Sequence, residues 1–216
     1  MIIEKRGNIN FGPYVAYYKI HNELLNGLTK RGEKCTPGSG NKNLAGVIED
    51  QRGYKMEDKK WFIKEFQLYI DDYVESSISF IGQQFNEVQH SKKFTLIDLW
   101  INYMKQNEDN PEHTHSGMLS WIMYLQTPDL TEERAKYEGK SIGPGGTTFH
   151  YGEHSHPKWA EHTYLYQPEV RGLWIFPAQL RHQVISFKTK GERISVSGNL
   201  FFVHPNDEST VLKEIK

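Results

Sequence analysis

The sequence predicts an α+β fold in which supporting helices precede a β-sandwich or jelly roll. In the first part of the chain, apolar side chains recur at three- and four-residue steps, which is the spacing of one helix face. After residue 93 the period changes to two, and short apolar runs alternate with Gly, Pro and Asn turn signals. Helices followed by a series of short strands are typical of an α+β fold built on a sandwich or jelly roll.

Two helices are expected, over residues 13–30 and 56–89. Pro13 suits the first position of a helix, and the second segment carries a long stripe of aromatic and aliphatic residues of the kind that forms a core. Between them, residues 31–54 are rich in Gly, Asn and Lys and predict an unusually long loop. A loop of this length is either a surface connection or a flap over a site.

The expected strands cover residues 94–104, 118–126, 146–151, 163–168, 171–177, 183–188 and 193–203. A chain of 216 residues is long enough to bury a sizeable core. We therefore expect a single domain over residues 1–216, with a helical support region at 1–92 and the β-core at 93–204.

The composition is that of an ordinary soluble globular protein, with 37% hydrophobic and 25% charged residues. The net charge of −1 gives no electrostatic reason to expect nucleic acid or an anionic membrane as a partner. No apolar run is long enough for a membrane helix, and the N-terminal residues lack the apolar core of a signal peptide. Cys35 is the single cysteine, so no internal disulfide can form. We expect a cytoplasmic protein.

Three histidines are candidate ligands of one metal site. His113 and His115 stand at positions i and i+2, so in an extended segment both imidazoles point to one face and reach one ion. His182 follows much later, in a run that is typical of two strands joined by a bend. Beyond it, Arg193 and Ser195 share one face of a strand. This set fits a redox metal with a carboxylate-bearing cosubstrate.

These ordered motifs resemble the 2-oxoglutarate and Fe(II)-dependent oxygenase superfamily, and in particular its small phage and bacterial members. The matching segments are 99–104, 113–117, 120–125, 174–177, 180–184 and 193–199. The resemblance implies a double-stranded β-helix of the cupin-like, jelly-roll kind with N-terminal supporting helices. It also implies a hydroxylase that acts on an unidentified small-molecule or peptide substrate and releases succinate and CO2. A phage-encoded protein of this kind works in the host cytoplasm.

The resemblance also assigns roles to individual residues. It implies that Fe(II) is held by His113, His115 and His182. It further implies that 2-oxoglutarate is held through its far carboxylate by Arg193 and Ser195. Further candidates for cosubstrate binding are Tyr124 and Asn102.

One position departs from the family pattern, because His115 stands where the usual His-x-Asp/Glu motif has its carboxylate. Three explanations are open: a three-His site, a substitute carboxylate from Glu112 or Asp98, or a chain that binds metal poorly. Two alternative functions follow. One is a three-His cupin-type dioxygenase that needs no 2-oxoglutarate. The other is a non-catalytic jelly-roll protein with a binding or structural role, as in a virion.

Other histidines are expected to have ordinary roles. A second His-x-His pair, His154 and His156, lies in a Gly- and Pro-bracketed stretch that predicts an exposed hairpin excursion. His21, His90 and His204 belong to no constellation. The sequence also lacks a phosphate-binding Gly loop in strand-to-helix context, a nucleophile elbow and a zinc-finger cysteine set.

Overall fold

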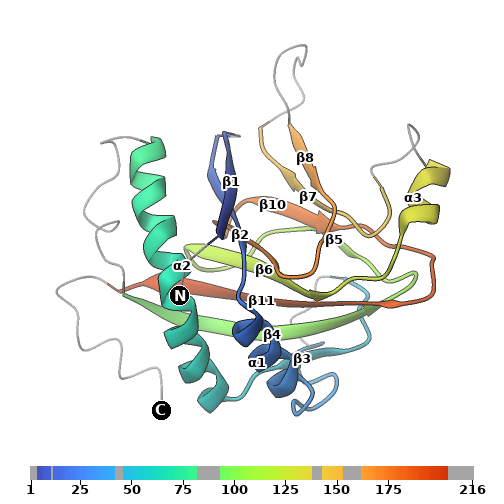
Figure 1. Ribbon diagram of the computed structural model, residues 1–216, viewed down its shortest axis with the longest axis horizontal. Helices are drawn as coiled ribbons and strands as arrows, with labels where there is room; N and C mark the ends of the chain where they lie inside the picture. Colours follow the sequence, from blue (N-terminus) through green and yellow to red (C-terminus); the bar gives the residue numbers. More distant parts are fainter. Residues whose placement is uncertain are drawn as a thin grey trace.

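The computed structural model describes residues 4–10, 12–41, 46–81, 93–137, 143–152 and 162–203 (Figure 1). In chain order its elements are β1 (Glu4–Asn10), β2 (Tyr14–Lys19), α1 (Asn22–Gly32), β3 (Gln51–Gly53), α2 (Met56–Ile81), β4 (Phe94–Lys105), β5 (Asn110–His113), β6 (Leu119–Gln126), α3 (Thr131–Tyr137), β7 (Thr147–His150), β8 (Thr163–Tyr166), β9 (Gly172–Pro177), β10 (Arg181–Val184) and β11 (Glu192–Phe202). In these residues, no helix has the length and apolar character needed to cross a membrane.

The strands form two antiparallel sheets. The larger has seven strands in the order β1-β2-β9-β6-β11-β4-β3, and the smaller has four in the order β5-β10-β7-β8. Figure 1 shows β5 and β10 of the smaller sheet above β6, β11 and β4 of the larger one. Two facing antiparallel sheets with few helices form the jelly roll expected from the sequence.

The main core lies between the outer face of the larger sheet and the two long helices. The aromatic stripe of α2 packs on Trp121 of β6, with ring centroids 4.8 Å apart for Phe66 and 5.6 Å apart for Phe62. Gly198 on β11 makes room for this indole, since a Cβ there would lie 2.2 Å from its Cζ2 atom. The prediction that the stripe is structural is confirmed. Residues 82–89 of the expected helix lie outside the described part of the chain.

The helix expected over residues 13–30 is wrong in its first half. Tyr14–Lys19 is strand β2, and the helix α1 begins only at Asn22. Tyr14, Ala16 and Tyr18 belong to the core under the helices, whereas Val15 and Tyr17 belong to a second cluster between the sheets. A strand that is buried on both faces is apolar without alternation, so its sequence does not show the period of two.

The region before residue 93 therefore supplies strands as well as helices to the fold. The expected loop at 31–54 ends in β3, which pairs with β4 at the edge of the larger sheet. Asp50 fastens this segment, because its side chain accepts a bond from the Gly38 amide at 3.1 Å and its carbonyl accepts one from the Tyr103 amide at 2.9 Å. The described parts of the segment are thus held against the open edge of the sheet.

Candidate metal centre

Two paired strands bring the three predicted histidines together. His113 ends β5 and stands directly opposite His182 of β10 in the antiparallel register. His115 lies two residues beyond the strand, where its amide donates to the Ala178 carbonyl at 2.9 Å. One ring nitrogen from each of the three imidazoles lies within 4.8 Å of the other two. This triad is close enough to share one metal ion.

Backbone carbonyls fix the tautomer of two of these histidines. Nδ1 of His113 lies 2.7 Å from the Pro111 carbonyl, and Nδ1 of His182 lies 2.8 Å from the Leu180 carbonyl. A carbonyl only accepts, so each Nδ1 carries the proton and each Nε2 keeps its lone pair. This arrangement is the one that orients metal-binding histidines.

The Nε2 atoms of His115 and His182 lie 3.1 Å apart. Since the His182 tautomer leaves a lone pair on its Nε2, a metal-free His115 must donate its own Nε2 proton across this contact. A cation between the two nitrogens replaces that proton and lets both lone pairs bind it. The two Nε2 atoms are therefore close enough to bind one cation together.

All three imidazoles are neutral at physiological pH. Burial lowers the pKa of His115 to about 4, with a smaller contribution from His113. Burial also lowers the pKa of His113, and that of His182 falls well below its usual value because the ring is buried and faces the other two imidazoles. Neutral imidazole is the form that binds metal.

Neither substitute carboxylate joins the triad. Glu112 is turned to the rim, where Oε1 accepts a bond from Nη1 of Arg181 at 3.1 Å. Asp98 is exposed. The group of possible metal ligands that the described residues form consists of the three imidazoles alone. The geometry favours a three-His site among the three explanations.

Arg193 is a buried cation that pairs with no anion in the described part of the chain. Its side chain is 2% exposed, and no ion pair connects it to another described residue. Nη2 donates to Oγ1 of Thr147 at 3.4 Å, Nη1 approaches the sulfur of Met104 at 3.8 Å, and the Nε proton has no acceptor. Burial lowers the pKa of the guanidinium, which nevertheless stays charged. Such a charge is costly unless an anion joins it.

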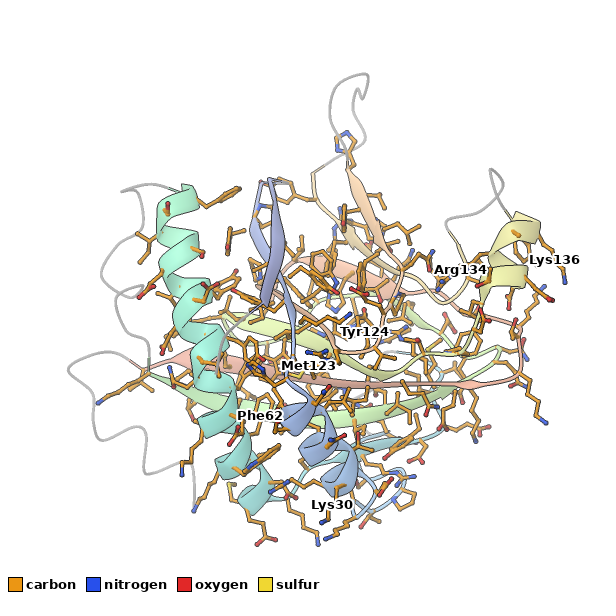
Figure 2. The ribbon with its side chains drawn as sticks, in the orientation of Figure 1. Lys30, Phe62, Met123, Tyr124, Arg134 and Lys136 are labelled. Atoms are coloured by element: carbon orange, nitrogen blue, oxygen red, sulfur yellow. The ribbon has the colours of Figure 1, made fainter. Side chains whose placement is uncertain are left out.

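The other predicted cosubstrate residues surround this guanidinium in different ways. Ser195 and Asn102 face each other across the β11–β4 pair, and the side-chain oxygen of Asn102 is buried without a partner. Tyr124, labelled near the centre of Figure 2, is fully buried and lies under the guanidinium at 5.1 Å. Its hydroxyl is hydrogen-bonded to Oγ1 of Thr147 at 2.9 Å. Tyr124 therefore contacts Arg193 through the face of its ring and not through its hydroxyl.

A narrow cavity of about 30 Å³ joins the triad to Arg193, Ser195 and Asn102. A wider cleft of about 430 Å³ shares His113 and His115 with it. Thr147 and Met104 contact Arg193 directly but are not among the residues predicted from the sequence. Met104 stands opposite Arg193 in the β4–β11 register, but that register cannot be read from either strand alone. Thr147 comes from the other sheet and carries no local signal.

The remaining histidines form no second centre in the described residues. His154, His156, His90 and His204 lie outside that part of the chain. His21 precedes α1, is half-buried and packs its ring 6.2 Å from that of Tyr69, with no other candidate metal ligand grouped with it among the described residues.

The fold and this site define a class of protein, the double-stranded β-helix proteins with a candidate non-haem metal centre. Residues 98–199, a little under half of the chain, match the family described as "Putative 2OG-Fe(II) oxygenase". The predicted resemblance to the 2-oxoglutarate and Fe(II)-dependent oxygenases is therefore confirmed over this region. None of the curated proteins compared with the sequence matches it.

Solved structures of such oxygenases share the fold. A prolyl-4-hydroxylase from Pseudomonas putida is 11% identical, with a TM-score of 0.51 over 87% of this chain and 92% of that one. HygX from Streptomyces hygroscopicus, solved with nickel, 2-oxoglutarate and hygromycin B, is 9% identical, with a TM-score of 0.52 over 86% and 82%. A Trichoplax adhaerens prolyl hydroxylase in complex with a hypoxia-inducible-factor peptide fragment is 11% identical, with a TM-score of 0.51 over 93% and 87%. The expected double-stranded β-helix is confirmed, and the neutral triad fits Fe(II).

Proposed function

We propose that this chain is an Fe(II)- and 2-oxoglutarate-dependent oxygenase that hydroxylates an unidentified small-molecule or peptide substrate, with release of succinate and CO2. The family match and the fold support the oxygenase class. The observation that carries the cosubstrate is the buried guanidinium of Arg193, which pairs with no carboxylate of the described residues and lines the same cavity as the three imidazoles. A dianionic cosubstrate reaches both at once.

In this proposal His113, His115 and His182 hold Fe(II) through their Nε2 atoms. Bound Fe(II), 2-oxoglutarate and O2 together supply the oxidising power for C–H hydroxylation, which the protein's own side chains lack. The chain contributes placement. The Pro111 and Leu180 carbonyls hold two of the imidazoles in the tautomer that binds metal.

Arg193 holds the far carboxylate of 2-oxoglutarate in the proposed complex. Its guanidinium can form two parallel charge-assisted hydrogen bonds to a carboxylate. The Nε–H group, which has no acceptor among the described residues, is available as one of the two donors. The Ser195 hydroxyl donates a hydrogen bond to the same carboxylate. The side-chain amide of Asn102 donates to this end of 2-oxoglutarate as well. Because the cavity is narrow, the flexible Met104 side chain moves aside when the diacid enters. Tyr124 keeps the guanidinium in place.

The test is an anaerobic titration of the purified protein with Fe(II) and then 2-oxoglutarate, followed by visible spectroscopy. A metal-to-ligand charge-transfer band is expected, because it forms only when iron and cosubstrate share one site. In Arg193→Ala, iron should still bind while the concentration of 2-oxoglutarate needed for the band rises steeply. An unchanged 2-oxoglutarate affinity in this variant would remove the main support for the proposal.

A second candidate function rests on His115 itself. A triad of three imidazoles is the ligand set of a cupin-type dioxygenase that needs no 2-oxoglutarate, although this function leaves the buried Arg193 unexplained. Iron binding without a charge-transfer band would favour this candidate. A protein that binds neither iron nor 2-oxoglutarate would instead be a jelly-roll module with a binding or structural role.

A further inference from the structure

The wider cleft beside the triad has the size of a ligand site. Its volume of about 430 Å³ falls within the roughly 300–1,000 Å³ that ligand pockets occupy. His113 and His115 line it, so a molecule in this cleft lies next to the candidate metal position. Trp100 forms part of its wall and packs its ring 5.6 Å from that of His115. The cleft is therefore where the substrate of the proposed oxygenase has room to bind.

Two opposite charges line this cleft without being paired. Lys59 comes from the first turns of α2 and Asp98 from β4. Neither side chain forms an ion pair or hydrogen bond with another described residue. The neighbouring acids behave differently: Asp58 pairs with Arg31 at 3.1 Å and Asp50 bonds to Arg52. Lys59 and Asp98 are thus available to a charged ligand in the cleft.

Two buried amides lie in the same lining. Gln51 of β3 is 5% exposed and Asn199 of β11 is 4% exposed, and the side-chain oxygen of each accepts no hydrogen bond from a described residue. A buried polar atom without a partner carries a desolvation cost that a ligand can remove. An amide offers both acceptor and donors, so these groups accept N–H donors or bind carboxylate oxygens. They suit a small polar ligand that carries groups of both kinds.

We propose that the cleft binds a small zwitterion, namely a free α-amino acid, as the substrate of the proposed oxygenase. Asp98 receives the ammonium group, Lys59 receives the carboxylate, and Gln51 and Asn199 complete their hydrogen bonds. The apolar part of the molecule lies against Trp100 beside the triad. A ligand with charge of one sign would leave one of the two residues unpaired and be repelled by it. That the amino acid is a substrate rests on the proposed function, whereas its binding to the cleft does not depend on that function.

The probes are the common L-amino acids, each compared with its N-acetyl derivative and its carboxamide. Equilibrium dialysis measures their binding to the full chain, with and without Fe(II) and 2-oxoglutarate under anaerobic conditions. At least one free amino acid should bind and shift the charge-transfer band. Blocking either its amine or its carboxylate should weaken binding about tenfold, as expected when a hydrogen bond to a charged group is lost.

Matched variants assign the two ends of the ligand. Lys59→Gln should weaken binding of the free amino acid about tenfold and leave binding of its carboxamide unchanged. Asp98→Asn should also weaken binding of the free amino acid about tenfold, and it should leave binding of the N-acetyl derivative unchanged. The controls are Lys60→Gln and Glu57→Gln, which remove a positive and a negative charge from exposed positions of α2 outside the cleft lining. Both should bind as the unchanged protein does.

The outcomes separate this inference from the proposed function. If the charge-transfer band forms but no free amino acid binds, the zwitterion proposal is overturned and the oxygenase proposal stands. Equal binding of free and blocked forms, or equal loss in the control variants, also overturns it. If the band does not form, the oxygenase proposal fails, and dialysis without iron still decides whether the cleft takes a zwitterion.

Discussion

Replacing Arg193 with methionine tests whether this buried cation serves a ligand or the fold. In the ligand-free protein the change removes a cation–π contact with Tyr124 at 5.1 Å, worth about 0.5–2 kcal/mol. It also removes a long hydrogen bond to Thr147 at 3.4 Å, worth about 1 kcal/mol. Against this, it relieves the burial of an unpaired charge, which costs several kcal/mol. The free energy of unfolding should therefore stay the same or rise by a few kcal/mol.

Cosubstrate binding should respond in the opposite way. Removing one partner of a buried, hydrogen-bonded charge pair costs about 2–5 kcal/mol. The affinity for 2-oxoglutarate should therefore be weaker by a factor between about thirty and several thousand. Anaerobic titration measures this affinity, and urea denaturation measures the stability of the ligand-free protein. Arg181→Met is the control, because Arg181 is exposed and bonded to Glu112. A variant that unfolds easily yet binds 2-oxoglutarate normally would refute the reasoning.

Three further predictions concern the triad and its neighbour. His115→Ala should weaken Fe(II) binding at least about tenfold in competition with a chelating dye, and unchanged binding would exclude His115 as a ligand. Ser195→Ala should weaken 2-oxoglutarate binding about tenfold with iron binding unchanged, which the charge-transfer titration checks. In metal-free protein the unfolded state binds more protons than the folded one, since burial lowers the pKa of His115 to about 4. Stability is then fully present above about pH 6.5 and is lost toward pH 4, by up to about 1.4 kcal/mol per pH unit. Urea denaturation with a chelator should show this slope, and His115→Gln should reduce it.

The parts of the fold that the sequence predicted are those with a clean local period. The stripe of α2 repeats over many turns, and β11 alternates so strictly that Arg193 and Ser195 face the cavity while Val196 and Leu200 enter the core. The His113–His115 spacing likewise depends on local geometry alone. The spacing of His113 and His115 does not predict that His182 lies beside them. The sequence indicated this proximity only through the order of the family motifs.

The parts that failed depend on partners distant in the chain. Residues 14–19 read as a helix because both faces of β2 are buried, one by the helices and one by the smaller sheet. Thr147 reaches Arg193 from β7, and Gln51 enters the cleft from a strand of three residues. The pairing of strands within the sheets determines where these residues lie. Neither composition nor periodicity predicts that pairing.

The charges of the site have a consequence for how metal and cosubstrate bind. The narrow cavity is lined by the three neutral imidazoles and Arg193, and none of the described Asp and Glu residues lines it. In the proposed complex iron adds positive charge there, and the two carboxylates of 2-oxoglutarate would neutralise both the iron and the guanidinium. Each ligand should therefore strengthen binding of the other, and by linkage the two factors must be equal. His115→Asp places a carboxylate in the triad, so iron should need the cosubstrate less and the coupling factor should fall. An equal or larger factor in His115→Asp would show that the charge of the triad does not set the coupling.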